Sequence, residues 1–260
     1  KQLVPTPQAL PRQLSALPSA DQPELIVWSE QGLGDGIQFS RYLGLLDARN
    51  VPFLFLAHKP LVPLYRDWMG LGDRVVVSID RSQGPPREQD PRLHIPLLSL
   101  PLLFGTELDT VPAFTPYFKA PAPPPQHLVV PEPPGGLAVG IVWATNPDNK
   151  AMYRNKTLPL QCLIPTLLRL IELDLIELHS LQVGADASQL APWLSHPRVT
   201  DWSSQLNDFS DTAHVVNQLD LVISVDTAVA HLAAALHKPT WLLLPHNADF
   251  RWLHQRSDSP

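Results

Sequence analysis

The chain has 260 residues, of which 44% are hydrophobic and 17% are charged, and its formal net charge is −6. This apolar content excludes general disorder, and the length allows two small domains that each bury a core. The negative net charge argues against nucleic acid and anionic lipid as partners.

The chain contains a single cysteine, Cys162, which excludes an internal disulfide. Its place in an apolar run predicts a buried packing role. No apolar stretch approaches the length of a membrane span. We therefore expect a cytoplasmic protein without an integral membrane segment. The first residue is Lys1 rather than methionine, and we interpret the chain as a fragment or a processed protein.

The front half of the chain alternates strand and helix patterns, as a parallel sheet requires. Residues 1–23 are rich in proline and lack a sustained period, so we expect a lead-in segment there. The runs that follow predict a strand over 25–28, a turn over 31–36, a helix over 37–48, a strand over 51–57, a helix over 61–69 and a strand over 75–79. Residues 84–118 mix prolines with apolar residues, so they predict a loop-rich edge of the lobe in which no element is assigned. Residues 24–120 are thus predicted to form an N-terminal Rossmann-like lobe.

Residues 121–136 (PAPPPQHLVVPEPPGG) mark the clearest boundary in the chain. Proline clusters favour extended backbone, and two glycines end the run. We therefore predict a proline-rich interdomain linker over this segment.

Residues 137–260 are predicted to form a second Rossmann-like lobe. The pattern predicts strands over 137–144, 177–183, 199–202, 221–225 and 240–244, and helices over 160–172, after Asp186, over 209–219 and over 228–236. Asn207 and Asp208 are possible caps of the third helix. A doubly wound sheet of about five strands follows, and such sheets bind ligands outside the carboxyl ends of their strands.

The densest cluster of polar residues lies where the strand over 221–225 enters a helix. Asp226 and Thr227 stand at the helix start, and His231 follows one turn later. Free N–H groups and the helix dipole favour an anion such as a diphosphate at this position. An equally simple interpretation is that Asp226 or Thr227 only caps the helix and that His231 is a structural histidine.

Two runs of sequence resemble one family. The run SVDTAVAHLAAALHKPTWLL (224–243) resembles the helix entry of the heptosyltransferases, the glycosyltransferase family 9 enzymes that use ADP-heptose. The run WSEQGLGDGIQFSRYL (28–43) resembles that family's first glycine-rich turn. Both runs also resemble motifs of bacterial proteins in which such a module is attached to tetratricopeptide repeats, although this chain shows no such repeat. The resemblance implies the α/β GT-B architecture, in which two Rossmann-like lobes with parallel sheets face each other across a cleft.

The resemblance also implies roles for individual residues. Asp35 matches the proposed catalytic base, and Lys156 matches a phosphate-contacting lysine to which we also give a catalytic role. The residues expected to bind the nucleotide sugar, with Asp186 facing the nucleoside, are Thr145, Lys156, Asp186, Asp226, Thr227, Ala228 and His231. Those expected on the acceptor side are Gly34, Gln38 and Arg41.

Three features leave alternatives open. Ala228 stands where the family usually has glycine, and Asp186 is one methylene shorter than the usual glutamate. The front-lobe region that would read the acceptor shows no match to the family. Ala228 and this unmatched region motivate a second hypothesis, a catalytically silent module that binds nucleotide or protein. Asp35 could merely cap its helix, in which case Glu30 is the rival base.

Other chemistries fit the sequence poorly. A dinucleotide fingerprint requires glycine where Ile37 stands, and no acidic residue follows the next strand. The histidines show no ligand spacing with a nearby carboxylate, so we predict no metal and no cofactor. Trp143, Trp202 and Trp241 are interpreted as core residues. Trp252 either closes the cleft between the lobes or serves as a packing anchor.

The resemblance implies an inverting glycosyltransferase of the hexosyl- or heptosyltransferase type, and we expect it to work without a metal ion. Its donor would be a nucleoside-diphosphate sugar, either one like ADP-heptose or another, because the sequence names neither the base nor the sugar. The acceptor would be a glycan, a lipid-linked glycan or a protein. Inversion requires one base and no covalent intermediate.

Overall fold

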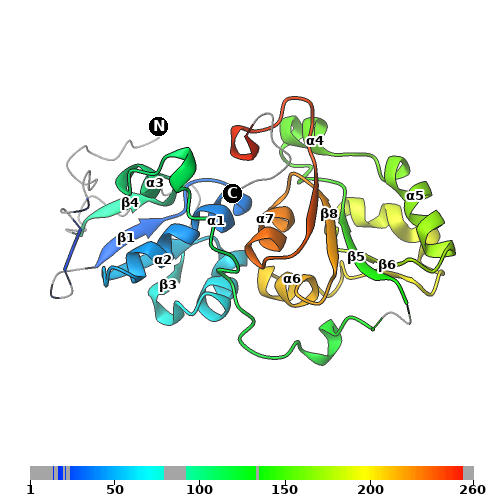
Figure 1. Ribbon diagram of the computed structural model, residues 1–260, viewed down its shortest axis with the longest axis horizontal. Helices are drawn as coiled ribbons and strands as arrows, with labels where there is room; N and C mark the ends of the chain where they lie inside the picture. The colour runs from blue at the N-terminus through cyan, green and yellow to red at the C-terminus, as the bar shows by residue number, and fades with distance from the viewer. Residues whose placement is uncertain are drawn as a thin grey trace. The chain divides into compact units, whose positions relative to one another are not determined.

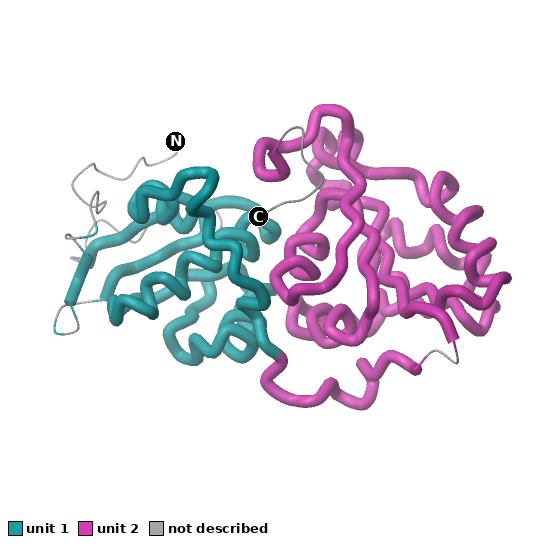
Figure 2. The backbone as a smooth tube through the Cα atoms, viewed as in Figure 1, with its two compact units in different colours: residues 1–119, 260 teal, residues 120–259 magenta. Residues whose placement is uncertain are grey.

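The computed structural model describes residues 14, 17–19, 21, 24–78, 92–132 and 135–253 (Figure 1). The described residues up to Lys119 form one compact unit, called unit 1, and those from Ala120 onward form unit 2 (Figure 2). Each unit contains its own parallel sheet, which confirms the predicted α/β class with two Rossmann-like lobes. Most of the predicted lead-in over 1–23 lies outside the described residues.

Unit 1 contains a four-stranded parallel sheet in the order β3-β2-β1-β4. Its strands are β1 (Leu25–Trp28), β2 (Phe53–Ala57), β3 (Val75–Val77) and β4 (His94–Pro96). Its α-helices are α1 (Leu33–Phe39), α2 (Arg41–Asp47) and α3 (Leu100–Leu103). Its shorter helical turns are η2 (Lys59–Leu61), η3 (Leu64–Trp68), η4 (Gly72–Arg74), η5 (Leu97–Ser99) and η6 (Leu108–Thr110).

The sequence pattern explains the core of unit 1. The apolar run of β1 is buried because this strand lies between two others. Strand β2 alternates, and it buries Phe53 and Phe55 completely. Phe55 meets the ring of Tyr65 edge-on at 5.0 Å between centroids. Turn η3 thereby supplies an aromatic cover for β2.

One prediction for unit 1 was wrong, and another was incomplete. The helix after β1 begins at Leu33 rather than at Ile37, so Asp35 lies within α1 and not in the turn before it. Glycine at Gly36 lets α1 pack closely on Tyr65, since a Cβ there would lie 3.0 Å from the hydroxyl of Tyr65. The stretch predicted to be irregular contains β4, which pairs with β1 at the edge of the sheet. An edge position tolerates the proline that masked this strand in the sequence.

Unit 2 contains a five-stranded parallel sheet in the order β7-β6-β5-β8-β9, as predicted in strand number. Its strands are β5 (Leu137–Val142), β6 (Ile176–Ser180), β7 (Val199–Asp201), β8 (Leu221–Val225) and β9 (Thr240–Leu243). Its helices are α4 (Lys150–Lys156), α5 (Leu160–Glu172), α6 (Phe209–Val216) and α7 (Ala228–Ala235). Its helical turns are η7 (Gln126–Leu128), η8 (Ala185–Trp193) and η9 (Phe250–Trp252).

The core of unit 2 forms between the sheet and α5. This helix places apolar residues three or four positions apart, and its buried residues are Leu160, Ile164, Leu167 and Ile171. They pack in one cluster with β5, β6 and Trp143. Cys162 lies off this face and is exposed, so the prediction of a buried cysteine was wrong. None of the helices in the described ranges is long and apolar enough to cross a membrane.

Two further predictions for unit 2 were wrong. Helix α4 was not predicted, because its sequence KAMYRNK has no apolar period; Asn149 caps it by accepting a hydrogen bond from the Met152 N–H at 3.2 Å. Trp143 and Trp202 are buried as predicted, but Trp241 is 64% exposed. It stands on β9, the edge strand of the sheet.

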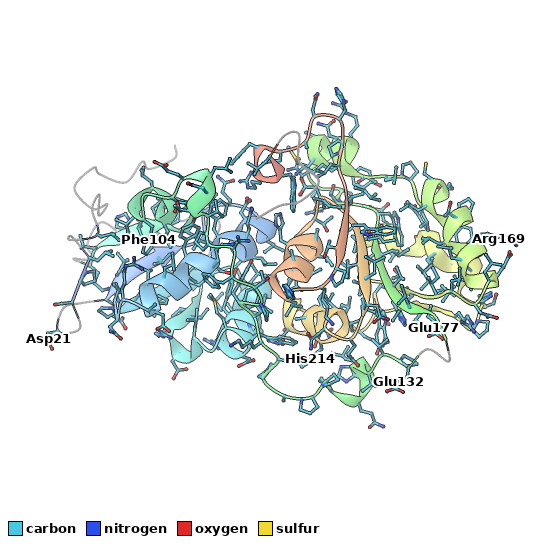
Figure 3. All side chains as sticks on the ribbon, in the orientation of Figure 1. Asp21, Phe104, Glu132, Arg169, Glu177 and His214 are labelled. Atoms are coloured by element: carbon cyan, nitrogen blue, oxygen red, sulfur yellow. The ribbon has the colours of Figure 1, made fainter. Side chains whose placement is uncertain are left out.

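The proline-rich segment predicted as a linker packs on unit 2 through Leu128, which is fully buried. Gln218, just after α6, holds the segment with both ends of its amide. Its Nε2 donates to the Leu128 carbonyl at 2.8 Å, and its Oε1 accepts from the Val130 N–H at 3.0 Å. Figure 3 labels His214 on α6 and Glu132 farther along the segment. Residues 126–130 are therefore a fixed part of unit 2.

Candidate functional site

The carboxyl ends of β5 and β8 adjoin in the middle of the unit 2 sheet, because these strands pair directly. Helix α7 begins immediately after β8, with Thr227 in the N-cap position. The Thr227 hydroxyl does not cap the helix and instead lies 3.0 Å from Ser224 Oγ. The first N–H groups of a helix have no intrahelical acceptor, and the helix dipole is positive there. This edge is therefore suited to an anion.

A buried ion pair lies beside this helix entry. Lys156 Nζ, at the end of α4, stands 2.6 Å from Asp226 Oδ2. The lysine side chain is 20% exposed and the aspartate 7%. Taking two charges out of water is expensive, so such pairs persist where geometry and neighbouring groups support them. The structure thus brings together two residues that are 70 positions apart in the sequence.

His231 occupies the first turn of α7 beside the same aspartate. Its Nε2 lies 4.0 Å from Asp226 Oδ1, which is an electrostatic distance rather than a hydrogen bond. Its ring stacks on Trp252, with centroids 4.7 Å apart and planes 17° from parallel. Both side chains are buried. Of the two interpretations of Trp252, the packing anchor is present within unit 2.

The turn η9 brings a second carboxylate toward Lys156. Asp249 caps η9 by accepting from the Arg251 N–H at 3.1 Å, and it pairs with the Arg251 guanidinium at 2.8 Å. Burial raises the pKa of Asp249, but the hydrogen bonds from Arg251 and the positive charges of Arg251 and Lys156 outweigh it and leave this pKa below its ordinary value. Lys156 therefore interacts electrostatically with carboxylates on two different segments, Asp226 and Asp249.

Thr145 lies next to the end of α4. Its N–H donates to Thr157 Oγ1 at 3.2 Å, directly after Lys156. Its own hydroxyl is buried and has no hydrogen-bond partner within the described part of the chain. Gln182 fixes the preceding backbone, because its Oε1 accepts from the N–H groups of Trp143 at 3.2 Å and Ala144 at 2.9 Å. These bonds tie the carboxyl end of β5 to the segment after β6.

Asp186 joins η8 to α4. Gly184 at the N-cap of η8 has φ of 80°, a conformation that favours glycine. Asp186 Oδ1 accepts from the Tyr153 hydroxyl at 2.8 Å and from Gln189 Nε2 at 2.6 Å. The hydrogen bond to Asp186 raises the pKa of Tyr153. Asp186 thus braces the helix that carries Lys156, and its predicted contact with a nucleoside stays a prediction.

In unit 1, both candidate bases accept hydrogen bonds from backbone N–H groups. Asp35 Oδ2 accepts from the Gly32 N–H at 3.0 Å at the start of α1. Glu30 accepts from the N–H groups of Leu97 at 3.1 Å and Leu98 at 3.0 Å, at the start of η5. Burial raises the pKa of Glu30 most, these hydrogen bonds lower it, and the charge of Asp35 raises it again. The capping role of Asp35 is present, and it is compatible with a second role as a base.

The predicted acceptor-side residues differ in accessibility. Gly34 and Gln38 are half-buried on α1, whereas Arg41 is only 7% exposed. Arg41 Nη1 donates to the Pro112 carbonyl at 2.8 Å, and its Nε donates to the Gln38 carbonyl at 3.0 Å. Its guanidinium also lies over the Tyr117 ring. Arg41 therefore anchors the chain around residue 112.

The structure groups the predicted residues unevenly. Lys156, Asp226, Thr227 and His231 gather at the α7 entry, and Ala228 is its first helical residue. Sequence analysis missed Tyr153, Thr157, Gln182 and Asp249 as neighbours of this group, and no motif marked them. Within the described ranges, no three His, Cys, Asp or Glu side chains are grouped so as to hold a metal ion.

Comparison with known proteins agrees with the resemblance seen in the sequence. The family model "Glycosyltransferase family 9 (heptosyltransferase)" matches residues 206–243, which include β8 and α7. No curated protein matches the chain.

Solved heptosyltransferases and related proteins share the fold. A family 9 glycosyl transferase from Veillonella parvula has a TM-score of 0.58 at 10% identity, with 86% of this chain and 82% of that chain covered. The E. coli ADP-heptose lipopolysaccharide heptosyltransferase II has a TM-score of 0.51 at 11% identity, with 85% of each chain covered.

The iron-containing dodecameric glycosyltransferase TibC from enterotoxigenic E. coli has a TM-score of 0.55 at 15% identity; the match covers 87% of this chain but 59% of TibC. TibC has also been solved in complex with ADP-D-β-D-heptose. The chain is therefore similar to glycosyltransferase family 9 at β8 and α7, and it has the two-sheet α/β fold, GT-B, of the solved heptosyltransferases.

Proposed function

We propose that this protein is a glycosyltransferase that moves a sugar from a nucleoside diphosphate to an acceptor hydroxyl, with inversion at the anomeric carbon and without a metal ion. The observation that carries the proposal is the buried Lys156–Asp226 pair at the entry of α7. The family match over 206–243 includes Asp226 and the helix entry. TibC has been solved with ADP-D-β-D-heptose, and the E. coli protein is an ADP-heptose heptosyltransferase, which supports a donor of this class.

The proposed chemistry divides between the two units. The acceptor hydroxyl oxygen forms a bond to the anomeric carbon, and the bond from that carbon to the diphosphate oxygen breaks. The electron pair of the broken bond stays on the diphosphate, and Asp35 takes the hydroxyl proton. Lys156, the first N–H groups of α7 and His231 stabilise the negative charge that develops on the leaving diphosphate. A lysine and a helix entry supply this stabilisation where other enzymes use a divalent cation.

Donor binding tests the first half of the proposal. The full chain should be melted with and without ADP, UDP and GDP, because a ligand that binds only the folded state raises the melting temperature. We expect at least one of them to stabilise the wild type and to stabilise Lys156→Met much less. Cys162→Ser, an exposed position on α5, is a matched control and should respond like the wild type.

Turnover tests the second half. Ala228 favours the silent-module alternative, because it is the first residue of α7 and its Cβ would crowd a phosphate oxygen that approaches this backbone. An active enzyme releases nucleoside diphosphate from its donor sugar in the presence of an acceptor glycan, lipid-linked glycan or protein. Saturable binding with no release under any acceptor would contradict the enzymatic proposal and support the silent module.

A further inference from the structure

The η9 segment, residues 245–253, follows the edge strand β9. Most of its side chains are exposed or half-buried, and Phe250 is 67% exposed. Trp252 differs, since it is only 9% exposed. Trp252 is thus the buried side chain of this segment.

That ring is placed against the candidate phosphate site. The indole of Trp252 covers one face of the His231 imidazole at 4.7 Å, and Asp226 stands 4.0 Å from Nε2 at the imidazole edge. The stacked indole on one face and the carboxylate at the edge leave the imidazole little freedom to rotate. The imidazole is therefore fixed in orientation at the first turn of α7, where the helix favours an anion.

The η9 turn also places a carboxylate near Lys156, the second residue proposed to contact the diphosphate. Asp249, three residues before Trp252, lies close enough to Lys156 for the lysine charge to lower its pKa. Arg251 is only 16% exposed and pairs with Asp249 at 2.8 Å. The η9 segment thus reaches both His231 and Lys156, although it contains no residue of the family motif.

We propose that Trp252 is a positioning residue of the donor site, which holds the His231 imidazole in the orientation that contacts the diphosphate. This inference rests on the proposed function, because it requires a nucleoside diphosphate at the α7 entry. Aromatic stacking of this kind corresponds to about a three-fold to ten-fold change in affinity.

The affinity of the full chain for the best nucleoside diphosphate should be measured for Trp252→Phe and Trp252→Leu. Phenylalanine keeps a flat ring and should bind within about two-fold of the wild type, whereas leucine should weaken binding about three-fold to ten-fold. Phe250→Leu removes a ring from the same turn, but that ring lies against Arg251. This control should leave the affinity unchanged.

A double-mutant cycle separates positioning from general destabilisation. In a His231→Ala background, Trp252→Leu should cause no further loss of affinity, because the ring that it positions is already absent. Independent losses in the cycle, or full affinity in Trp252→Leu, would overturn the inference while the proposed function stands. Failure of the wild type to bind any nucleoside diphosphate would overturn both.

Discussion

The two sheets present charged residues at their carboxyl ends in different ways. In unit 2, Lys156 and Asp226 neutralise each other inside a nearly closed environment. In unit 1, Asp35 and Glu30 are held by neutral backbone N–H groups. Backbone N–H groups favour the charged form of a carboxylate, although burial still raises the pKa of Glu30. A buried ion pair has to be rearranged before either partner can bind a ligand.

This difference indicates a division of labour. Under the proposed function, unit 1 supplies a fixed carboxylate that accepts a proton. Unit 2 supplies a lysine that pairs with Asp226 until the diphosphate competes for it.

Lys156→Met should destabilise the protein by roughly 3 kcal/mol, because Asp226 would remain buried without its counter-charge. The free energy of unfolding from urea titration measures this effect. The double variant Lys156→Met/Asp226→Asn should regain most of the lost stability, since it buries no lone charge. Its turnover should stay low, which separates the structural role of the pair from its catalytic role.

Asp35→Asn should lower turnover by about 100-fold, because an amide cannot accept the acceptor proton. Its donor affinity and melting temperature should stay near those of the wild type, since asparagine can still accept the Gly32 N–H. Steady-state kinetics with saturating donor provides the measurement. If Glu30→Gln instead abolishes turnover while Asp35→Asn retains it, the base is Glu30.

The pH dependence of stability should differ in sign between the two units. Burial lowers the pKa of His179 to about 4, below its ordinary value of 6.5, so the unfolded state binds the proton more readily between these values. This histidine contributes stability above that window, which is lost as the pH falls. The loss between about pH 7 and about pH 5 should be roughly 2 kcal/mol. In His179→Gln, which keeps an acceptor for Trp202 Nε1, urea unfolding should lack this slope.

Glu30 should act in the opposite direction. Its pKa is raised in the folded state, mainly by burial, so the folded state holds the proton more tightly than the unfolded state. Its contribution is complete below its ordinary pKa of 4.5 and is lost as the pH rises through the folded value. Glu30→Gln should therefore become more stable relative to the wild type as the pH rises from about 4 to neutrality.

Ala228→Gly should have the smallest effect. Removing the Cβ at the first helical residue of α7 should destabilise the helix by about 0.5–1 kcal/mol or less. It should also strengthen donor binding if phosphate oxygens approach this backbone. Calorimetry with the stabilising nucleotide measures the change, and weaker binding would contradict a close phosphate approach.

The strands and long helices were largely predictable, because burial forces an apolar pattern on them. Strand β8 was predicted with its observed bounds, and α5 shows a helical apolar period. Helix α4 escaped prediction because a cap and the Tyr153–Asp186 bond hold it, and neither leaves a periodic signal. Strand β4 was not predicted because it contains Pro96, and proline in a sequence usually indicates a loop.

The candidate site was predictable only in part. The helix entry after β8 follows from a strand that ends in polar residues, so Asp226 and Thr227 stand out. The partner of Asp226 does not follow, because Lys156 reaches it from a helix without a pattern. Gln182 and Asp249 act through single side-chain contacts, which have no sequence signature.

The two hydrogen bonds of the Gln218 amide to Leu128 and Val130 decide where unit 2 can be cut out as a fragment. A fragment that begins at Leu137, the start of β5, would lack Leu128 and leave the apolar surface under it open to water. Such a fragment should aggregate, whereas one that begins at or before Gln126 keeps its own cover. Limited proteolysis should accordingly spare residues 126–130 and cut more readily in the exposed stretch just before them.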